Sequence, residues 1–218
     1  MNFNKLIVYI IAGAVTIILI YTLSEVGPAE EENPVFLETD EAYFQHINES
    51  RDQKDRFLST APDSPLEDEI KKSFEEISYF PIDTAYHILA DFLPNFTDAI
   101  EKIQLNNGTS ESYLDYGTLS FELKGETRKL TIYKSMDGED LLFLPFTDLT
   151  NGQTTYGGGR YLEPQIVDPE KMLIDFNTAY NPYCAYNHDY VCPLPPPENH
   201  LTLAVEAGEK AFEIESAD

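Results

Sequence analysis

Short runs of alternating apolar and polar residues, separated by turn residues, limit what residues 77–212 can fold into. Apolar residues alternate with polar ones over 119–123, and the alternation resumes over 130–132 beyond Gly125. Because successive side chains of a strand point to opposite faces, this alternation predicts a hairpin with one buried face. Similar segments predict strands at 84–92, 99–105, 113–123, 128–134, 140–146, 158–163, 171–176 and 200–206. We expect a mainly β (α+β) domain, either an antiparallel barrel or a sandwich.

The preceding segment, 38–76, shows helical spacing instead and is expected to pack on the β domain. Apolar residues recur at steps of three and four between 40 and 58, which predicts an amphipathic helix. Ser64, Pro65 and Glu67 predict a capping box and a second helix over 65–74.

The first helix carries three cations in its C-terminal half, Arg51, Lys54 and Arg56. Cations near that end of a helix are favoured by the helix dipole, which predicts a solvated face. The alternative is that they face an anionic ligand.

The first 23 residues have a different character, because Leu6–Leu23 contains no charged residue. Such a run is about 27 Å long as a helix, close to the hydrocarbon thickness of a bilayer. It is longer than a usual secretory apolar region, which favours a retained transmembrane anchor over a cleaved signal peptide. We therefore expect a single-pass protein of the cell membrane, with the lipid bilayer as partner. Because the positive residue Lys5 precedes the run, we expect the C-terminal domain to lie outside the cytoplasm. Residues 24–37 have the composition of an acidic linker.

The whole chain is strongly acidic, with 39 Asp and Glu against 14 Lys and Arg and a formal charge of −25. A surface of this charge repels phosphate backbones, so nucleic acid is not an expected partner.

The stretch 154–210 concentrates the residues of special geometry and chemistry. Its Gly157–Gly159 run precedes Arg160 but lacks the spacing of either nucleotide-binding fingerprint, so no cofactor is expected. Arg160 can bind a carboxylate or phosphate bidentately, or it can form an internal ion pair with Asp175 or Glu163. Around it we take as ligand-binding candidates Arg160, Asp175, Asn177, Tyr180 and Glu198.

Cys184 and Cys192 flank His188 at equal spacing. Three interpretations are open: a disulfide, which would stabilise the fold by about 2–3 kcal/mol, three ligands of a metal site completed by Asp189 or His200, or a Cys184 nucleophile with His188 or His200 as base. A domain outside the cytoplasm and an even cysteine count favour the disulfide. No metal is therefore expected.

Three segments in the same order carry a resemblance to a known family: YGGGRYL, LIDFNTAYNPYCAY and CPLPPPENHLTLAVEAGEK. They are similar to the C-terminal signature of the bacterial and archaeal domain-of-unknown-function family 1684, and YFPID is similar to that family's entry into its β-region. The resemblance covers about the last 140 residues. It implies no activity, because that family has none assigned.

The sequence thus leaves three functional hypotheses. The first is a binding module for a small anionic ligand between the 157–160 turn and the loop around Cys184, with Arg160 as anion contact. The second is a hydrolase-like enzyme that uses the same pocket, its catalytic residues not identified. The third is a structural or envelope-interaction protein in which Arg160 and Asp175 pair internally.

Overall fold

A computed structural model of the chain describes residues 39–136 and 141–212. The expected membrane anchor and linker lie outside these residues. Within the described part of the chain, no helix has the length and hydropathy needed to cross a bilayer. The compact unit that contains the described residues begins at Thr39.

Two α-helices open this unit. Helix α2 spans Asp40–Thr60, and the hydroxyl of its N-cap Thr39 accepts a hydrogen bond from the Ala42 amide. Helix α3 spans Asp68–Ser73 and begins after Glu67. The prediction that a helix starts at Pro65 is wrong, because the Ser64 hydroxyl accepts from the Leu66 amide and donates to the Leu58 carbonyl, which ties a turn to α2.

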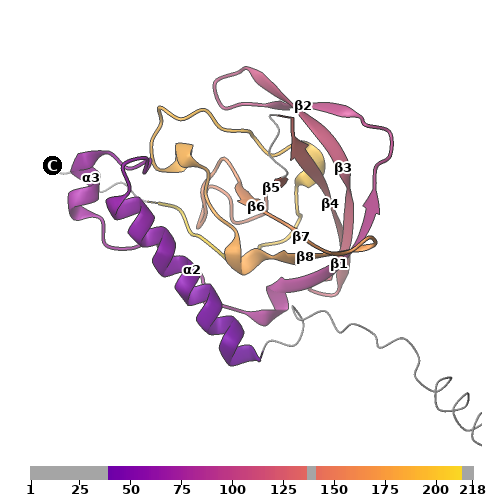
Figure 1. Cartoon of the computed structure of the whole chain (residues 1–218), viewed down its shortest axis with the longest axis horizontal. Helices are drawn as coiled ribbons and strands as arrows, with labels where there is room; N and C mark the ends of the chain where they lie inside the picture. The colour runs from indigo at the N-terminus through magenta and orange to yellow at the C-terminus, as the bar shows by residue number, and fades with distance from the viewer. Residues whose placement is uncertain (1–38, 137–140, 213–218) are drawn as a thin grey trace, which may run out of the picture. The chain divides into compact units, whose positions relative to one another are not determined.

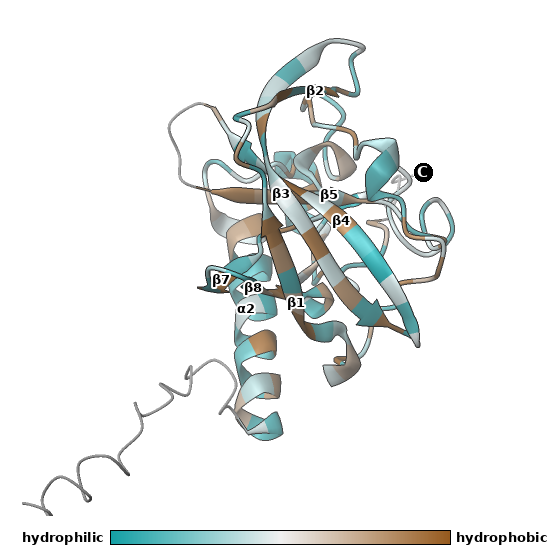
Figure 2. Cartoon of the chain, turned by 90° about the vertical axis from the view of Figure 1, so that its right-hand side faces the viewer, coloured by the Kyte–Doolittle hydropathy of each residue, from teal (hydrophilic) through white to brown (hydrophobic). Residues whose placement is uncertain are grey.

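The strands form one antiparallel sheet in the order β6-β5-β4-β3-β1-β8-β7, with β2 paired to β3. Their bounds are β1 His87–Pro94, β2 Ile100–Gln104, β3 Ser110–Leu123, β4 Glu126–Ser135, β5 Leu142–Phe146, β6 Arg160–Leu162, β7 Gln165–Asp168 and β8 Lys171–Asp175. The sheet curls into a half-barrel, and hydrophobic and hydrophilic residues alternate along its strands (Figure 2). A mainly β fold with N-terminal helices is therefore confirmed.

The predicted hairpin is present and joins β3 to β4. Lys124 and Gly125 both have positive φ, 52° and 78°, as its two-residue turn requires. Leu119 faces Leu130 across the pair, and both side chains belong to the core. Strand β7 was not predicted from the sequence.

The C-terminal segment departs from the prediction of a strand over 200–206, which is wrong. It lies between α2 and strands β3 and β4 without joining the sheet as a strand (Figure 1). Asn199 holds its start, because its side-chain amide donates to the carbonyls of Thr131 at 2.8 Å and Pro145 at 2.7 Å. Four short 3-10 helices complete the described elements: Thr84–Tyr86, Phe176–Thr178, Tyr183–Ala185 and Pro197–Asn199.

Candidate functional site

Arg160, the first candidate, begins β6 and has 0% of its surface exposed. Its Nη2 donates to Asp148 Oδ2 at 3.0 Å, and the Asp148 side chain is also fully buried. Burial lowers the pKa of Arg160, and the charge of Asp148 acts in the opposite direction. The ion pair therefore compensates a charge that is removed from water.

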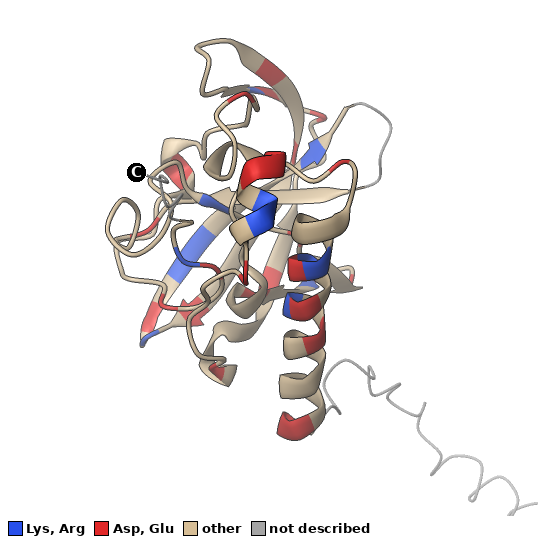
Figure 3. Cartoon of the chain, turned by 90° about the vertical axis from the view of Figure 1, so that its left-hand side faces the viewer, with Lys and Arg blue, Asp and Glu red and all other residues tan. Residues whose placement is uncertain are grey.

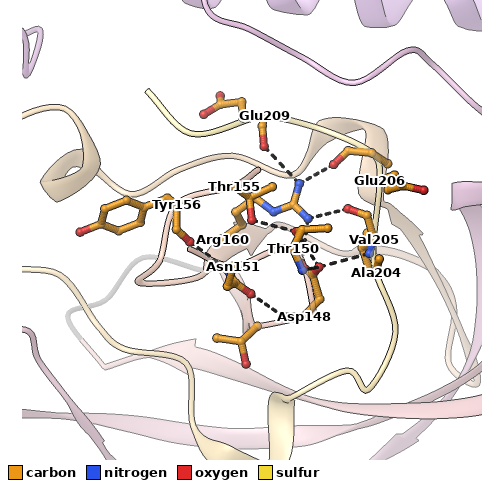
Figure 4. Close-up of polar contacts among 12 residues, drawn as sticks. Asp148, Thr150, Asn151, Thr155, Tyr156, Arg160, Ala204, Val205, Glu206 and Glu209 are labelled. Atoms are coloured by element: carbon orange, nitrogen blue, oxygen red, sulfur yellow. Dashed lines mark hydrogen bonds and ion pairs between the residues drawn. The ribbon is translucent and has the colours of Figure 1, made fainter. Parts of the chain in front are cut away.

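The rest of the guanidinium binds the C-terminal segment through its carbonyls (Figure 4). Nη2 donates to Val205 O at 2.9 Å, and Nη1 donates to Ala207 O and to Glu209 O, the latter at 3.2 Å. One guanidinium therefore binds three alternate carbonyls of this segment, in which Gly208 has φ +75°. These carbonyls are bound by a side chain and not by a neighbouring strand.

The prediction that Arg160 contacts an anionic ligand does not fit this position. The alternative of an internal ion pair is correct in kind, but the partner is Asp148 rather than Asp175 or Glu163. Four internal acceptors and complete burial leave this side chain a structural role.

The glycine directly before Arg160 is explained by the close approach of its neighbours. Gly159 has φ +92°, and a Cβ there would lie 2.5 Å from Pro195 Cγ and 2.8 Å from Phe146 O. A side chain at this position would therefore clash with two neighbours and strain the backbone.

Asp175 and Asn177 lie together at the end of β8, as predicted, and they fasten α2 to the sheet. Tyr43 donates to Asp175 Oδ2 at 2.8 Å, and Asn177 Nδ2 donates to the Tyr43 hydroxyl at 2.9 Å and to Asp175 Oδ1 at 3.0 Å. Asn177 also exchanges hydrogen bonds with the backbone of Asp83. Most of their hydrogen-bonding capacity is therefore used inside the fold.

The structure separates the last two candidates. Tyr180 donates to Glu163 at 3.0 Å, and burial, followed by the nearby Glu163 charge, raises its pKa. Glu198 is exposed and accepts from Tyr133 at 2.8 Å. Of the five predicted residues, Asn177 and Tyr180 line a common cavity.

This cavity lies beneath α2 and has a volume of about 370 Å³. We call it the polar compartment. Its wall combines Arg51, Lys54 and other polar side chains of α2 with Asn177, Tyr180, Glu163 and Glu209. The cations lie in the C-terminal half of α2 (Figure 3).

Arg51 is half-buried, and burial lowers its pKa. Its guanidinium carbon lies 4.3 Å from the centroid of the Tyr79 ring. Nη2 donates one long hydrogen bond, 3.4 Å, to Asn177 O, while the buried Nε has no hydrogen-bond partner among the described residues. The Nε of Arg160 is likewise without a partner among the described residues. Arg51 differs because its guanidinium borders a cavity and makes one long hydrogen bond there.

Lys54, by contrast, is paired. Its ammonium group donates to Glu209, whose side chain is 1% exposed. Glu209 also accepts from Tyr186 at 2.5 Å and from the Asn181 amide at 2.8 Å. Lys54 and Glu209 therefore neutralise each other at the base of the cavity, which leaves Arg51 as the cation available to a ligand.

A second cavity of about 760 Å³ adjoins the first and shares Lys54, Glu163 and Tyr180 with it. We call it the aromatic compartment, because most of its wall is apolar and six of its residues besides Tyr180 are Phe or Tyr. They come from α2, the sheet and the 183–193 loop: Phe57, Tyr113, Phe143, Tyr161, Tyr183 and Tyr190. Phe143 and Tyr161 meet edge to face at 4.7 Å between ring centroids. The two compartments together form what we call the α2 groove.

Both cysteines are buried free thiols in this structure. The Cys184 amide donates to Cys192 Sγ at 3.3 Å, and Cys192 lines the aromatic compartment. His200 contacts Thr147 Oγ1 at 3.0 Å and His188 is exposed, so the geometry supports neither as a base for Cys184. Among the described residues, no group of three or more metal-ligating side chains could hold an ion, which gives the metal interpretation no support.

Sequence reasoning placed Arg51 and Lys54 on a solvated face, and that interpretation is wrong. The buried positions Ile47 and Leu58 bracket them at steps of four, three and four residues. Such steps keep side chains on one face of a helix. The two cations thus interrupt the apolar stripe of α2, a signal that was present in the sequence.

A family model described as "Protein of unknown function (DUF1684)" matches residues 72–210. A solution NMR structure of an uncharacterized protein from gene locus rrnAC0354 of Haloarcula marismortui is 37% identical to this chain, with a TM-score of 0.61. The match covers 81% of this chain and 97% of that chain. No curated protein matches. The resemblance noted in the sequence is confirmed, and the chain belongs to the DUF1684 family.

Proposed function

We propose that the domain binds a small organic anion with an apolar part in the α2 groove. The observation that carries the proposal is Arg51, a half-buried cation that lines the cavity and makes one long hydrogen bond, 3.4 Å, from Nη2. A carboxylate or phosphate is a stronger acceptor for the Nη groups, and a guanidinium binds such a group bidentately. Arg51 thus takes the role that the sequence assigned to Arg160.

The polar compartment contains further groups that orient an anion. Ser50 offers a hydroxyl donor, and Gln165 offers an amide. Lys54 is paired with Glu209, and Glu163 adds a second carboxylate to the same wall as Arg51. The wall therefore suits a singly charged group better than a multiply charged one.

The aromatic compartment supports the apolar part of the proposal. Its volume of about 760 Å³ lies in the range that holds a small organic molecule. Tyr183 and Tyr190, 5.3 Å apart between ring centroids, form an edge-to-face pair on its wall. A ring or acyl chain attached to the anionic group would contact these rings while the anion reaches Arg51.

The test is a thermal-shift screen of the full-length protein in a neutral detergent against carboxylates that carry a ring or an acyl chain. The expected result is a higher melting temperature with phenylacetate than with its neutral analogue phenylacetamide, and loss of the difference in Arg51→Gln. Arg56→Gln is the matched control, because Arg56 lies exposed on the same helix. If no carboxylate shifts the wild type, or if the shift survives in Arg51→Gln, the proposal is wrong.

We also propose that residues 6–23 hold the protein in the cell membrane with this domain outside the cytoplasm. The support is the uncharged apolar run and the lysine before it. Full-length protein is expected in the membrane fraction after a high-pH wash, and protease added to intact cells is expected to degrade the domain. Release by the wash, or protection from the protease, would contradict the proposal.

A further inference from the structure

Cys192, a thiol in the wall of the aromatic compartment, lies beside a second thiol, Cys184. Cys184 and Cys192 begin and end one loop, and both are buried, 3% and 6% exposed. The Cys184 amide donates to Cys192 Sγ at 3.3 Å, and the Tyr156 hydroxyl donates to Cys184 Sγ at 3.6 Å. The fold therefore holds the two sulfurs together without a bond between them.

The surroundings of the pair favour thiol chemistry. Hydrogen bonds from the Cys192 thiol and the Tyr156 hydroxyl lower the pKa of Cys184 to about 7, although burial opposes them. The same hydrogen bond with Cys184, and then burial, raise the pKa of Cys192, so Cys184 is the thiol that ionises first. The thiolate is the reactive form in thiol and disulfide exchange. Cys192 lines the aromatic compartment, which gives a small reagent a path to the pair.

The position of the loop gives the pair a structural consequence. At the C-terminal end of the loop, the Asn106 amide donates a hydrogen bond to the Cys192 carbonyl at 3.0 Å. Within the loop, the Tyr186 hydroxyl donates to Glu209. Two residues that line the compartment belong to this region: Tyr183 directly precedes Cys184, and Tyr190 lies within the loop. A bond between the sulfurs would fix the loop that carries this aromatic wall.

We propose that Cys184 and Cys192 form a redox-active dithiol, which closes to an intrachain disulfide by exchange with a small disulfide such as oxidised glutathione. One cysteine thiolate, its proton released to solvent, attacks a sulfur of the small disulfide and expels one small thiolate. The second cysteine then loses its proton and attacks the sulfur of the first, which expels the other small thiolate. Two protein thiols are oxidised to one disulfide, and one small disulfide is reduced to two thiols.

The test counts thiols in the full-length protein. Reduced protein is incubated with oxidised glutathione, quenched with acid, unfolded, alkylated and weighed intact by mass spectrometry. The expected wild-type result is loss of both alkylation sites with no bound glutathione, and return of both after treatment with a dithiol reductant. The single variants Cys184→Ser and Cys192→Ser are expected to keep an alkylated thiol or one bound glutathione.

A second measurement keeps the test independent of how the variants fold. Wild-type protein is equilibrated with mixtures of reduced and oxidised glutathione, folded or in urea, and the disulfide fraction is compared. The folded protein is expected to form the disulfide at a lower share of oxidised glutathione than the unfolded chain, because the fold holds the sulfurs together. Two retained thiols in the folded wild type, stable glutathione adducts on both cysteines, or no difference between folded and unfolded chains would overturn the proposal. Thiol counts do not depend on a ligand, so this outcome is separate from that of the proposed function.

Discussion

Arg160 and Arg51 are both withdrawn from water, yet their surroundings differ. Arg160 is fully buried against Asp148 and three backbone carbonyls of residues 205–209. Arg51 is half-buried at a cavity and makes one long hydrogen bond, while its buried Nε, like that of Arg160, has no partner among the described residues. A fully buried charge with four internal acceptors, one of them a carboxylate, belongs to the architecture. A half-buried cation at a cavity with one long hydrogen bond is the better candidate for ligand binding.

The largest expected effect separates the two arginines by stability. Arg160→Met leaves the buried Asp148 carboxylate without its cation, which should lower the free energy of unfolding by about 3–5 kcal/mol. Arg51→Met removes a half-exposed side chain with one weak hydrogen bond and should cost about 1 kcal/mol or less. Urea denaturation followed by circular dichroism measures both values. Similar costs for the two variants would break the comparison.

The next effect concerns Gly159, the residue of the turn that directly precedes Arg160. Gly159→Ala introduces a Cβ 2.5 Å from Pro195 Cγ on a backbone with φ +92°, and should cost about 2–4 kcal/mol through strain and overpacking. Gly157→Ala is the matched control, since the nearest atom to its Cβ lies 3.7 Å away. We expect that control to change stability by less than about 1 kcal/mol. Equal losses in urea denaturation would show that the turn is not the constraint.

The smallest effect concerns Tyr43, which fastens α2 to the sheet, and it is measured as a change of stability with pH. Burial, and then the charge of Asp175, raises the pKa of Tyr43 above its ordinary value of 10.0. The unfolded chain therefore loses this proton near pH 10 while the folded chain keeps it. Stability from Tyr43 is fully present below pH 10 and falls as pH rises above it, by up to about 1.4 kcal/mol per pH unit.

Tyr43→Phe removes this term. Its plot of unfolding free energy against pH, measured between pH 10 and 11, should be less steep than that of the wild type by up to about 1.4 kcal/mol per unit. Near neutral pH the variant should lose about 1–2 kcal/mol, because Asp175 and Asn177 lose a hydrogen-bond partner. Identical slopes would mean that Tyr43 ionises alike in both states.

The sequence predicted those parts of the fold that depend on local patterns. Alternation over 119–132 gave the β3 and β4 hairpin, because one face of each strand is buried in the core. The same alternation over 200–206 led to a wrong strand, since Arg160 binds the carbonyls of Val205, Ala207 and Glu209 and Asn199 fixes the start of the segment. A partner that is distant in the chain decided the outcome there, and alternation carries no information about it.

For the candidate site too, the sequence predicted what depends on local patterns and missed what depends on partners distant in the chain. Asp175 and Asn177 were both chosen as candidates, and they lie two residues apart at the end of β8, where their side chains share a hydrogen bond. Arg160 was given the role of anion contact because its internal partners, among them Asp148, are not visible in the spacing of residues. Arg51 was assigned to solvent, although its position between Ile47 and Leu58 on the buried stripe of α2 marked it.

The most direct test of the distinction between the two arginines is calorimetric titration of the full-length protein with phenylacetate and with phenylacetamide. With Arg51 as the anion contact, wild type and Arg56→Gln should bind phenylacetate with the same affinity, and Arg51→Gln should bind it about tenfold more weakly or worse. Binding of phenylacetamide should change little between the three proteins. Equal phenylacetate affinity in Arg51→Gln and wild type, or no binding to the wild type, would contradict the assignment of the α2 groove as an anion site.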